Sequence, residues 1–236
     1  MNPVPHSVLA IAHRAGNSLA GLQQATTLGA DVIEADVHSY RGRLEVRHLK
    51  TMGPVPLLWD KWQLRSARAP RLFLEELLAA AARGATFMLD LKGQQSATGE
   101  AVAQHLHEYA PDNPVLVCSR YWPALTPMEH LPWVRTIRSA RTKTELSRLL
   151  RHTEQPGVRR GYGFSVHRSL LNAQTVRALH RHQQVVMTWP VNDPATLAAV
   201  LPFRASGTIG VISDEPAILS RLLADRAGRA DPDPDR

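Results

Sequence analysis

Residues 30–37, with the sequence ADVIEADV, are the most informative stretch of this chain. Their valines and isoleucine indicate a buried β-strand, and a buried strand normally excludes carboxylates. Because side chains alternate along a strand, Glu34 and Asp36 must lie on the same face. Two carboxylates this close repel each other unless a cation lies between them, and a hard divalent cation with oxygen ligands, Mg²⁺ or Ca²⁺, relieves that cost. The alternative is the end of a strand with two solvated acidic side chains.

Length and composition fit one large soluble domain. The chain has 236 residues, of which 44% are hydrophobic and 21% charged, so it can bury a substantial core. Cys118 is the only cysteine, which excludes an internal disulfide and a cysteine-rich zinc site. The first residues lack the basic and apolar segments of a signal peptide, and no run approaches the ~18 apolar residues of a membrane span. We therefore expect a cytoplasmic protein without a transmembrane segment.

The formal net charge of +7 points to anionic partners: phosphorylated metabolites, anionic lipids or nucleic acid. The basic residues are scattered along the chain, without a dense run, interleaved aromatic residues or a known nucleic-acid module. An arginine-rich composition that serves solubility explains this scatter better than a nucleic-acid surface, and we predict no nucleic-acid partner. No feature of the sequence predicts an oligomeric state.

Short apolar runs alternate with amphipathic stretches along the whole chain. The expected strands, each followed by an expected helix, are residues 8–12, 31–38, 86–91, 115–118, 134–137, 163–166, 185–191 and 208–212. Eight strand–helix pairs in this length predict an α/β fold, a single (β/α)8 TIM barrel over residues 1–224, followed by a disordered tail at 225–236. An open doubly wound sheet is the alternative, but it usually has about five or six strands and a glycine-rich turn after the first strand, which is missing here.

The unusual polar residues fall at the C-terminal ends of these strands, where the active site of a TIM barrel lies. They are His13, Arg14, Glu34, Asp36, His48, Asp90, Lys92, Ser119, Arg120, His167, Trp189, Asn192 and Asp214. Each alone has a structural explanation, since a histidine at a strand end is more often a hydrogen-bonding structural residue and Trp189 alone fits a core. Their joint position at one rim favours an active site.

Six motifs occur in order along most of the stretch between residues 8 and 223. They are His13-Arg14, GADVIEADV at 29–37, VRH at 46–48, LDLK at 89–92, VMTWPVN at 186–192 and GVISDEP at 210–216. Together they resemble the glycerophosphodiester phosphodiesterase family, whose members belong to a superfamily of phospholipase C-like TIM barrels.

The chain also departs from this family. The Pro-Glu-Asn-Thr motif after the first histidine is reduced to GNS at 16–18, and the usual His-Asp is His48-Leu49. The insertion after His48 is short, and Asp90 stands where the family mostly has glutamate. The Asp-x-Lys pattern, the compact first loop and the missing His-Asp are also features of sphingomyelinase D-like phospholipases, which are secreted and disulfide-bonded, unlike a chain with one cysteine.

The resemblance implies a metal-dependent phosphodiesterase that cleaves a small-molecule substrate: a glycerophosphodiester, giving glycerol phosphate and an alcohol, or a lysophospholipid-like molecule. One divalent ion, Mg²⁺ or Ca²⁺, is the implied cofactor. The implied site residues are Glu34, Asp36 and Asp90 for the metal, His13 and His48 for acid–base catalysis, and Arg14, Lys92, Trp189 and Asn192 for substrate binding. Two alternatives remain, a sphingomyelinase D-like or lysophospholipase D activity that gives a cyclic phosphate, and a barrel that binds phosphate without turnover.

An apolar set lies in the segment after the second histidine, where a rim loop is expected. It consists of Met52, Leu57, Leu58, Trp59 and Trp62. These side chains either plug the edge of the barrel or form an open lip that suits an acyl chain. The second interpretation predicts that lysophospholipids are cleaved at least as well as glycerophosphocholine.

Overall fold

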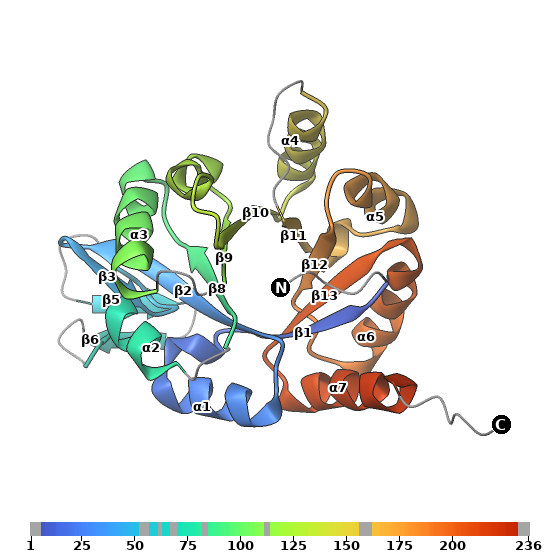
Figure 1. Cartoon of the computed structure of the whole chain (residues 1–236), viewed down its shortest axis with the longest axis horizontal. Coiled ribbons are helices and arrows are strands. Elements are labelled where there is room, and N and C mark those ends of the chain that lie inside the picture. Colours follow the sequence, from blue (N-terminus) through green and yellow to red (C-terminus); the bar gives the residue numbers. More distant parts are fainter. Residues whose placement is uncertain are drawn as a thin grey trace.

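The computed structural model describes residues 6–51, 57–60, 63–66, 70–81, 85–110, 114–155 and 162–230. Eight parallel strands close into a barrel because the first of them pairs with both the second and the last. In barrel order from the first strand they are β1 (Val8–Ala12), β2 (Val32–Tyr40), β8 (Phe87–Leu91), β9 (Val115–Ser119), β10 (Val134–Ala140), β11 (Gly163–His167), β12 (Val185–Trp189) and β13 (Thr208–Ser213). Figure 1 shows this ring of strands with the helices outside it, which confirms the predicted (β/α)8 barrel.

Helices follow the barrel strands. The α-helices are α1 (Leu19–Leu28), α2 (Leu74–Ala80), α3 (Ser96–Tyr109), α4 (Lys143–Thr153), α5 (Ala173–His180), α6 (Pro194–Val200) and α7 (Pro216–Ala230), and the 3-10 helices are η1 (Ala15–Asn17), η2 (Trp122–Met128), η3 (Arg168–Leu170) and η4 (Leu201–Ser206). The side chains of the N-cap residues Thr142 and Asp193 accept hydrogen bonds from the backbone of α4 and α6. Gly29 ends α1 with φ 78°, a left-handed conformation that glycine adopts without strain.

The rim segment after β2 forms short antiparallel strands. β3 (Arg43–Val46) pairs with β2 and with β7 (Leu72–Phe73), while β4 (Lys50–Thr51), β5 (Leu57–Asp60) and β6 (Gln63–Ser66) form a separate small sheet. Of the predicted apolar set, Met52 and Trp62 lie outside the described residues.

The C-terminal helix is longer than predicted. We expected it to end at Ala224, but α7 continues to Ala230, so the first six residues of the expected tail are helical. Alanine and arginine, frequent in this stretch, have high helix propensity and extend a helix without apolar periodicity. The remainder of the expected tail, residues 231–236, lies outside the described residues. None of the helices that the structure describes is long and apolar enough to span a membrane.

The barrel interior changes from apolar to polar along its axis. Its apolar part is a buried cluster that includes Leu9, Ile11, Val32, Met88, Leu116, Ile137, Val185, Met187 and Ile212. Alternate residues of each strand point into the barrel. Glu34 and Asp36 on β2, and Asp90 on β8, therefore point inward like the apolar residues before them, but they lie nearer the C-terminal ends of the strands. The polar residues at the barrel mouth therefore lie directly above a buried apolar cluster.

Candidate active site

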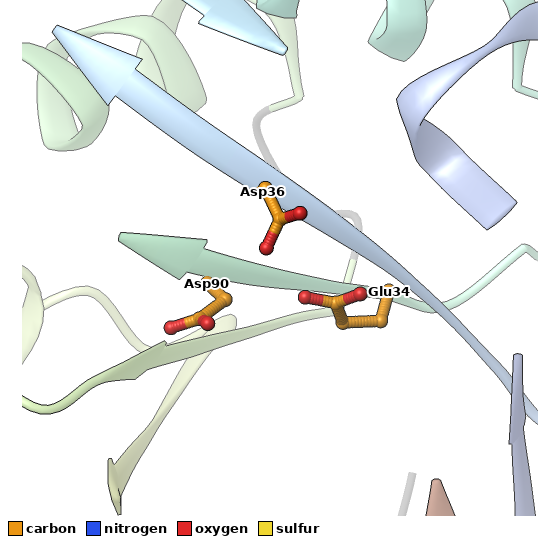
Figure 2. Close-up of side chains that lie close together, drawn as sticks. All are labelled: Glu34, Asp36 and Asp90. Carbon is orange, nitrogen blue, oxygen red and sulfur yellow. The ribbon is translucent and has the colours of Figure 1, made fainter. Parts of the chain in front are cut away.

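Three carboxylates from two neighbouring strands form the centre of the barrel mouth. Glu34 and Asp36 belong to β2, Asp90 belongs to β8, and Asp36 and Asp90 are directly paired in the strand register. One carboxylate oxygen from each residue lies within 4.8 Å of the others. Figure 2 shows the three groups pointing into the same space. The structure thus brings together the three residues that the sequence predicted as metal ligands.

Lys92 supplies positive charge to this cluster. Its Nζ lies 2.5 Å from Asp36 Oδ1 and also contacts Asp90 Oδ2. Burial acts to lower the pKa of Lys92, but the three carboxylates outweigh burial and raise it, so the side chain carries its charge. Three carboxylates and one ammonium leave the negative charge that a single divalent cation would neutralise.

The two carboxylates of β2 have opposite electrostatic environments. Burial, with the neighbouring charge of Asp36, raises the pKa of Glu34 well above its usual value. Burial also acts to raise the pKa of Asp36, but hydrogen bonds from His48, Lys92 and Asn17, with the charge of Lys92, hold it below its usual range. Glu34 is therefore the carboxylate whose ionised form depends most on an added cation.

Hydrogen bonds from the first loop fix the orientation of both carboxylates. The side chain of Asn17 donates to Asp36 Oδ2 at 2.8 Å and accepts from the Asp36 backbone N–H at 2.8 Å. The backbone N–H of Arg14 donates to Glu34 Oε2 at 2.6 Å, and Arg14 has φ 56°, a left-handed conformation that is uncommon outside glycine. Arg14 thus contacts the cluster through its backbone, while its side chain, which the sequence predicted as substrate-binding, is exposed.

His13 lies between the carboxylate cluster and Asp214. Its Nε2 is 4.0 Å from Glu34 Oε2, and its Nδ1 is 2.9 Å from Asp214 Oδ1. Burial acts to raise the pKa of Asp214, but the hydrogen bond and charge of His13 lower it to about 2. Asn192 donates to Asp214 Oδ2 at 2.8 Å and accepts from its backbone N–H. Asp214 was placed at the rim by sequence but was not predicted as a site residue, because its partner lies at the other end of the chain.

His48 is the second histidine of the mouth. Its Nδ1 lies 2.9 Å from Asp36 Oδ2. The residues on either side of it are tethered, since the backbone N–H of Arg47 donates to the Asp36 carbonyl at 3.0 Å and the Arg47 guanidinium donates to the Leu49 carbonyl. His48 is therefore presented by a loop that is hydrogen-bonded on both sides.

A buried ion pair holds Arg47 in this position. Glu45 is 1% exposed, its Oε2 lies 2.6 Å from Arg47 Nε, and its Oε1 contacts Arg71. Glu45 and Arg47 alternate with apolar residues in the sequence LEVR at 44–47, which is an unusual pattern for a buried strand. That pattern is the signal by which sequence reasoning could have found this pair.

Two of the predicted substrate-binding residues lie on the side of the mouth formed by β11 and β12. Trp189 is partly buried and meets His167 edge to face, with 5.1 Å between ring centroids. Burial, with the charges of Arg141 and Arg168, lowers the pKa of His167, which keeps this imidazole neutral. Asn192 contacts Asp214 and, through Ser213 Oγ at 3.2 Å, the end of β13. The predicted site residues thus line one mouth, with Asn192 turned towards Asp214.

Comparison with solved structures gives the same architecture. A phosphodiesterase of Oleispira antarctica, determined with its product sn-glycerol-3-phosphate, is 20% identical, with a TM-score of 0.69 over 92% of this chain and 96% of that one. The fold is that of the glycerophosphodiester phosphodiesterases. One from Parabacteroides distasonis is 20% identical, with a TM-score of 0.66 over 94% and 98% of the two chains. A protein of Silicibacter pomeroyi, provisionally named a glycerophosphoryl diester phosphodiesterase, is 18% identical, with a TM-score of 0.73 over 93% and 94%.

The likeness to glycerophosphodiester phosphodiesterases is one of structure. The chain matches no protein-family model and no curated protein. The similar structures nevertheless cover nearly the whole chain and nearly the whole of each compared protein. The barrel fold is therefore shared with these proteins over nearly the whole of each chain.

Proposed function

We propose that this protein is a metal-dependent phosphodiesterase that cleaves glycerophosphodiesters or lysophospholipid-like substrates. The observation that carries the proposal is the joint position of Glu34, Asp36 and Asp90 with two histidines and Lys92 at one barrel mouth. A phosphodiesterase of the same fold was determined with sn-glycerol-3-phosphate as its product, which supports a glycerophosphodiester substrate. A site that only binds phosphate has no need for an acidic cluster of this kind.

The residues present fit one divalent cation. All three donors are carboxylates, which favours Mg²⁺ or Ca²⁺ over zinc. Glu34 and Asp36 each have one oxygen held by a hydrogen bond from the first loop, as metal ligands commonly do. When bound, the cation would withdraw charge from a phosphoryl oxygen and stabilise the pentacoordinate phosphorus.

The two histidines are the proposed acid–base pair. One removes a proton from the attacking hydroxyl, and the other gives a proton to the oxygen of the departing alcohol, so the imidazoles exchange their protonation states over the reaction. Asp214 Oδ1 faces His13 Nδ1, which leaves Nε2 on the side of the carboxylate cluster. Asp214 would therefore hold the His13 tautomer and stabilise its charged form.

Positive and aromatic groups complete the proposed substrate site. The ammonium of Lys92 would stabilise the developing charge on the phosphoryl oxygens, with Arg14 adding charge at the rim. Trp189 would pack against the glycerol or headgroup. Asn192 would act here mainly through Asp214, to which it is hydrogen-bonded. The cytoplasmic location stays a prediction from the sequence.

The attacking hydroxyl distinguishes hydrolysis from the sphingomyelinase D-like alternative. Attack by water gives a phosphate monoester and an alcohol, whereas attack by a neighbouring hydroxyl of the substrate gives a cyclic phosphate and an alcohol. Three features of this chain favour the second course: the Asp90-x-Lys92 pattern, the compact first loop and the missing His-Asp.

Product analysis by phosphorus NMR tests the proposal. Glycerophosphocholine, glycerophosphoethanolamine and lysophospholipids are incubated with the protein and Mg²⁺ or Ca²⁺, with a parallel sample in chelator. We expect metal-dependent loss of the diester signal and the appearance of either a monoester or a cyclic phosphate. Binding of inorganic phosphate without turnover of any substrate, with either metal, would instead identify a phosphate-binding barrel.

A further inference from the structure

The small sheet that follows His48 has an apolar face open to solvent. Trp59 of β5 and Leu64 of β6 are directly opposite each other in the antiparallel register, so their side chains share one face. Trp59 is 41% exposed and Leu64 63% exposed, whereas Leu58, on the other face, is 7% exposed. The usual arrangement of a half-buried sheet, with polar residues outward, is therefore reversed at this pair.

This exposed pair lies next to the candidate active site. Trp59 pairs with Lys50 of β4, and Lys50 follows His48 by two residues, at most ~7 Å along an extended chain. A paired strand adds about 5 Å, so the Trp59 backbone lies on the order of 12 Å from that of His48. The pair thus stands at the rim of the mouth.

The distribution of exposed apolar residues is one-sided. Among the described residues, four large apolar side chains are strongly exposed: Leu19, Trp59, Leu64 and Tyr109. Leu19 begins α1, two residues after Asn17, which is bonded to Asp36. Tyr109 ends α3, the helix that leads into β9, and so lies at the opposite end of the barrel. Three of the four are therefore gathered at the catalytic end.

Positive charge accompanies these apolar residues. Exposed arginines follow the C-terminal ends of four strands, and they are Arg14, Arg120, Arg141 and Arg168. The Lys50 ammonium lies 5.8 Å from the centre of the Trp59 ring. Acidic side chains also lie at this rim: Glu145 contacts Arg120 and Asp214 contacts His13, and Asp193 and Glu215 are exposed. The rim thus carries apolar and basic side chains around the mouth, with some acidic side chains among them.

We propose that this rim docks on an anionic lipid surface, with Trp59 and Leu64 entering the headgroup region and the basic residues facing lipid phosphates. Tryptophan favours such interfaces because its ring is apolar and its N–H is polar. Each basic residue near an anionic membrane adds attraction that salt screens. Resting on the proposed function, this identifies the substrate class as lysophospholipids taken from a membrane rather than freely dissolved diesters.

A protein partner fits this surface less well. A stable protein interface covers roughly 800 Å² on each side, whereas two large side chains offer at most ~200 Å² each. Binding to a membrane does not require so large a contact area, because the insertion of two apolar side chains and the attraction of several cations to anionic lipids both add to the affinity. A lipid surface is therefore the occupant that the geometry favours.

Vesicle co-sedimentation tests the proposal. The full chain is mixed with phosphatidylcholine vesicles that contain either no or about 30% phosphatidylglycerol, with circular dichroism as a check of folding. We expect binding to the anionic vesicles, weakened by salt, and a loss of at least ~10-fold in affinity for Leu64→Glu and for Trp59→Ala. The matched control is Tyr109→Glu, which changes an equally exposed side chain at the far end and should bind as the wild type does.

Three results would overturn the docking surface. They are absence of wild-type binding to anionic vesicles, an equal loss in Tyr109→Glu, and a concentration-dependent dimer in sedimentation equilibrium that Leu64→Glu dissociates. Turnover of glycerophosphocholine is measured in parallel, and Leu64→Glu should leave it unchanged. If the wild type binds vesicles as expected but turns over no substrate, the docking surface stands and the proposed function fails, so the two failures are distinguishable.

Discussion

His13 and Asp214 follow the first and the last strand of the barrel, and Nδ1 of the histidine lies 2.9 Å from Oδ1 of the aspartate. Their meeting depends on closure of the barrel, because β1 and β13 pair in parallel with Ala12 opposite Ser213. The next residue on each strand is then His13 and Asp214, side by side. Closure of the barrel thus brings together an imidazole and a carboxylate from opposite ends of the chain.

Replacement of Asp214 should slow the reaction more than it weakens substrate binding. In Asp214→Asn the carboxylate that faces His13 Nδ1 is lost, so we expect kcat to fall by about 10²-fold with a smaller change in KM. The matched control is Asp193→Asn, a neighbouring exposed acid whose side chain caps α6. Steady-state kinetics of both variants check this, and equal kcat values in the two would contradict the role of Asp214.

Stability should depend on pH through the same aspartate. Its pKa is lowered to about 2 in the folded protein, below the value of ~3.9 in an unfolded chain. The unfolded chain therefore binds more protons between these values, and the stability from the His13–Asp214 pair is present above pH ~4 and lost as the pH falls towards ~2. Urea unfolding should show a difference between the wild type and Asp214→Asn that is present at pH ~4 and shrinks as the pH falls below it. A difference that grows with acidity would be the contrary result.

Glu34→Gln should raise the thermal stability of the metal-free protein and weaken its use of the metal. Burial and the charge of Asp36 raise the pKa of Glu34, so the ionised side chain destabilises the metal-free protein. We expect the variant to have a higher Tm than the wild type in chelator, and to need a higher Mg²⁺ or Ca²⁺ concentration for half-maximal activity. Thermal melts with and without metal, with a metal titration of the rate, measure both effects. A lower Tm in chelator would show that Glu34 is stabilised by its hydrogen bonds instead.

Removal of either histidine should abolish most turnover without unfolding the protein. His13→Ala and His48→Ala are each expected to lower kcat by about 10²–10⁴-fold, the usual contribution of an acid–base group. Circular dichroism melts serve as the folding control. A wild-type rate in one variant would remove that histidine from the proposed mechanism.

Arg47→Met should affect both the fold and the presentation of His48. It leaves Glu45, which is 1% exposed, with Arg71 as its cationic partner, so we expect a loss of stability smaller than the ~3–5 kcal/mol that a buried charge without any partner costs. Loss of the contact with the Leu49 carbonyl should also lower kcat by ~10-fold, with the metal requirement unchanged.

The control for this effect is Arg43→Met on the same strand. Arg43 pairs with Glu75 at 3.0 Å and is exposed, so its loss should cost roughly 0–1 kcal/mol. Urea unfolding and kinetics of the two variants make the comparison. Equal losses of stability and of kcat in the two variants would mean that the buried pair of Glu45 and Arg47 does not position His48.

Local patterns predicted most of the fold. The strand at residues 8–12 is where the sequence places it, because the pattern of apolar residues that marks a strand extends over only a few positions. The end of α7 was missed because helix propensity continued after the apolar pattern had stopped. Errors of this kind fall at element ends, where no packing partner is visible in the sequence.

The sequence by itself determined the barrel, through its eight alternating strands and helices. It also determined the shared face of Glu34 and Asp36, because side chains two residues apart on a strand point to the same side. Only the tertiary structure decided the pairing of His13 with Asp214, the contact of Asn17 with Asp36, and the buried pair of Glu45 and Arg47 that tethers the loop of His48. Such contacts depend on strand order, closure and loop path. They arise from the register of strands that meet only after folding, and no short-range pattern in the chain records that register.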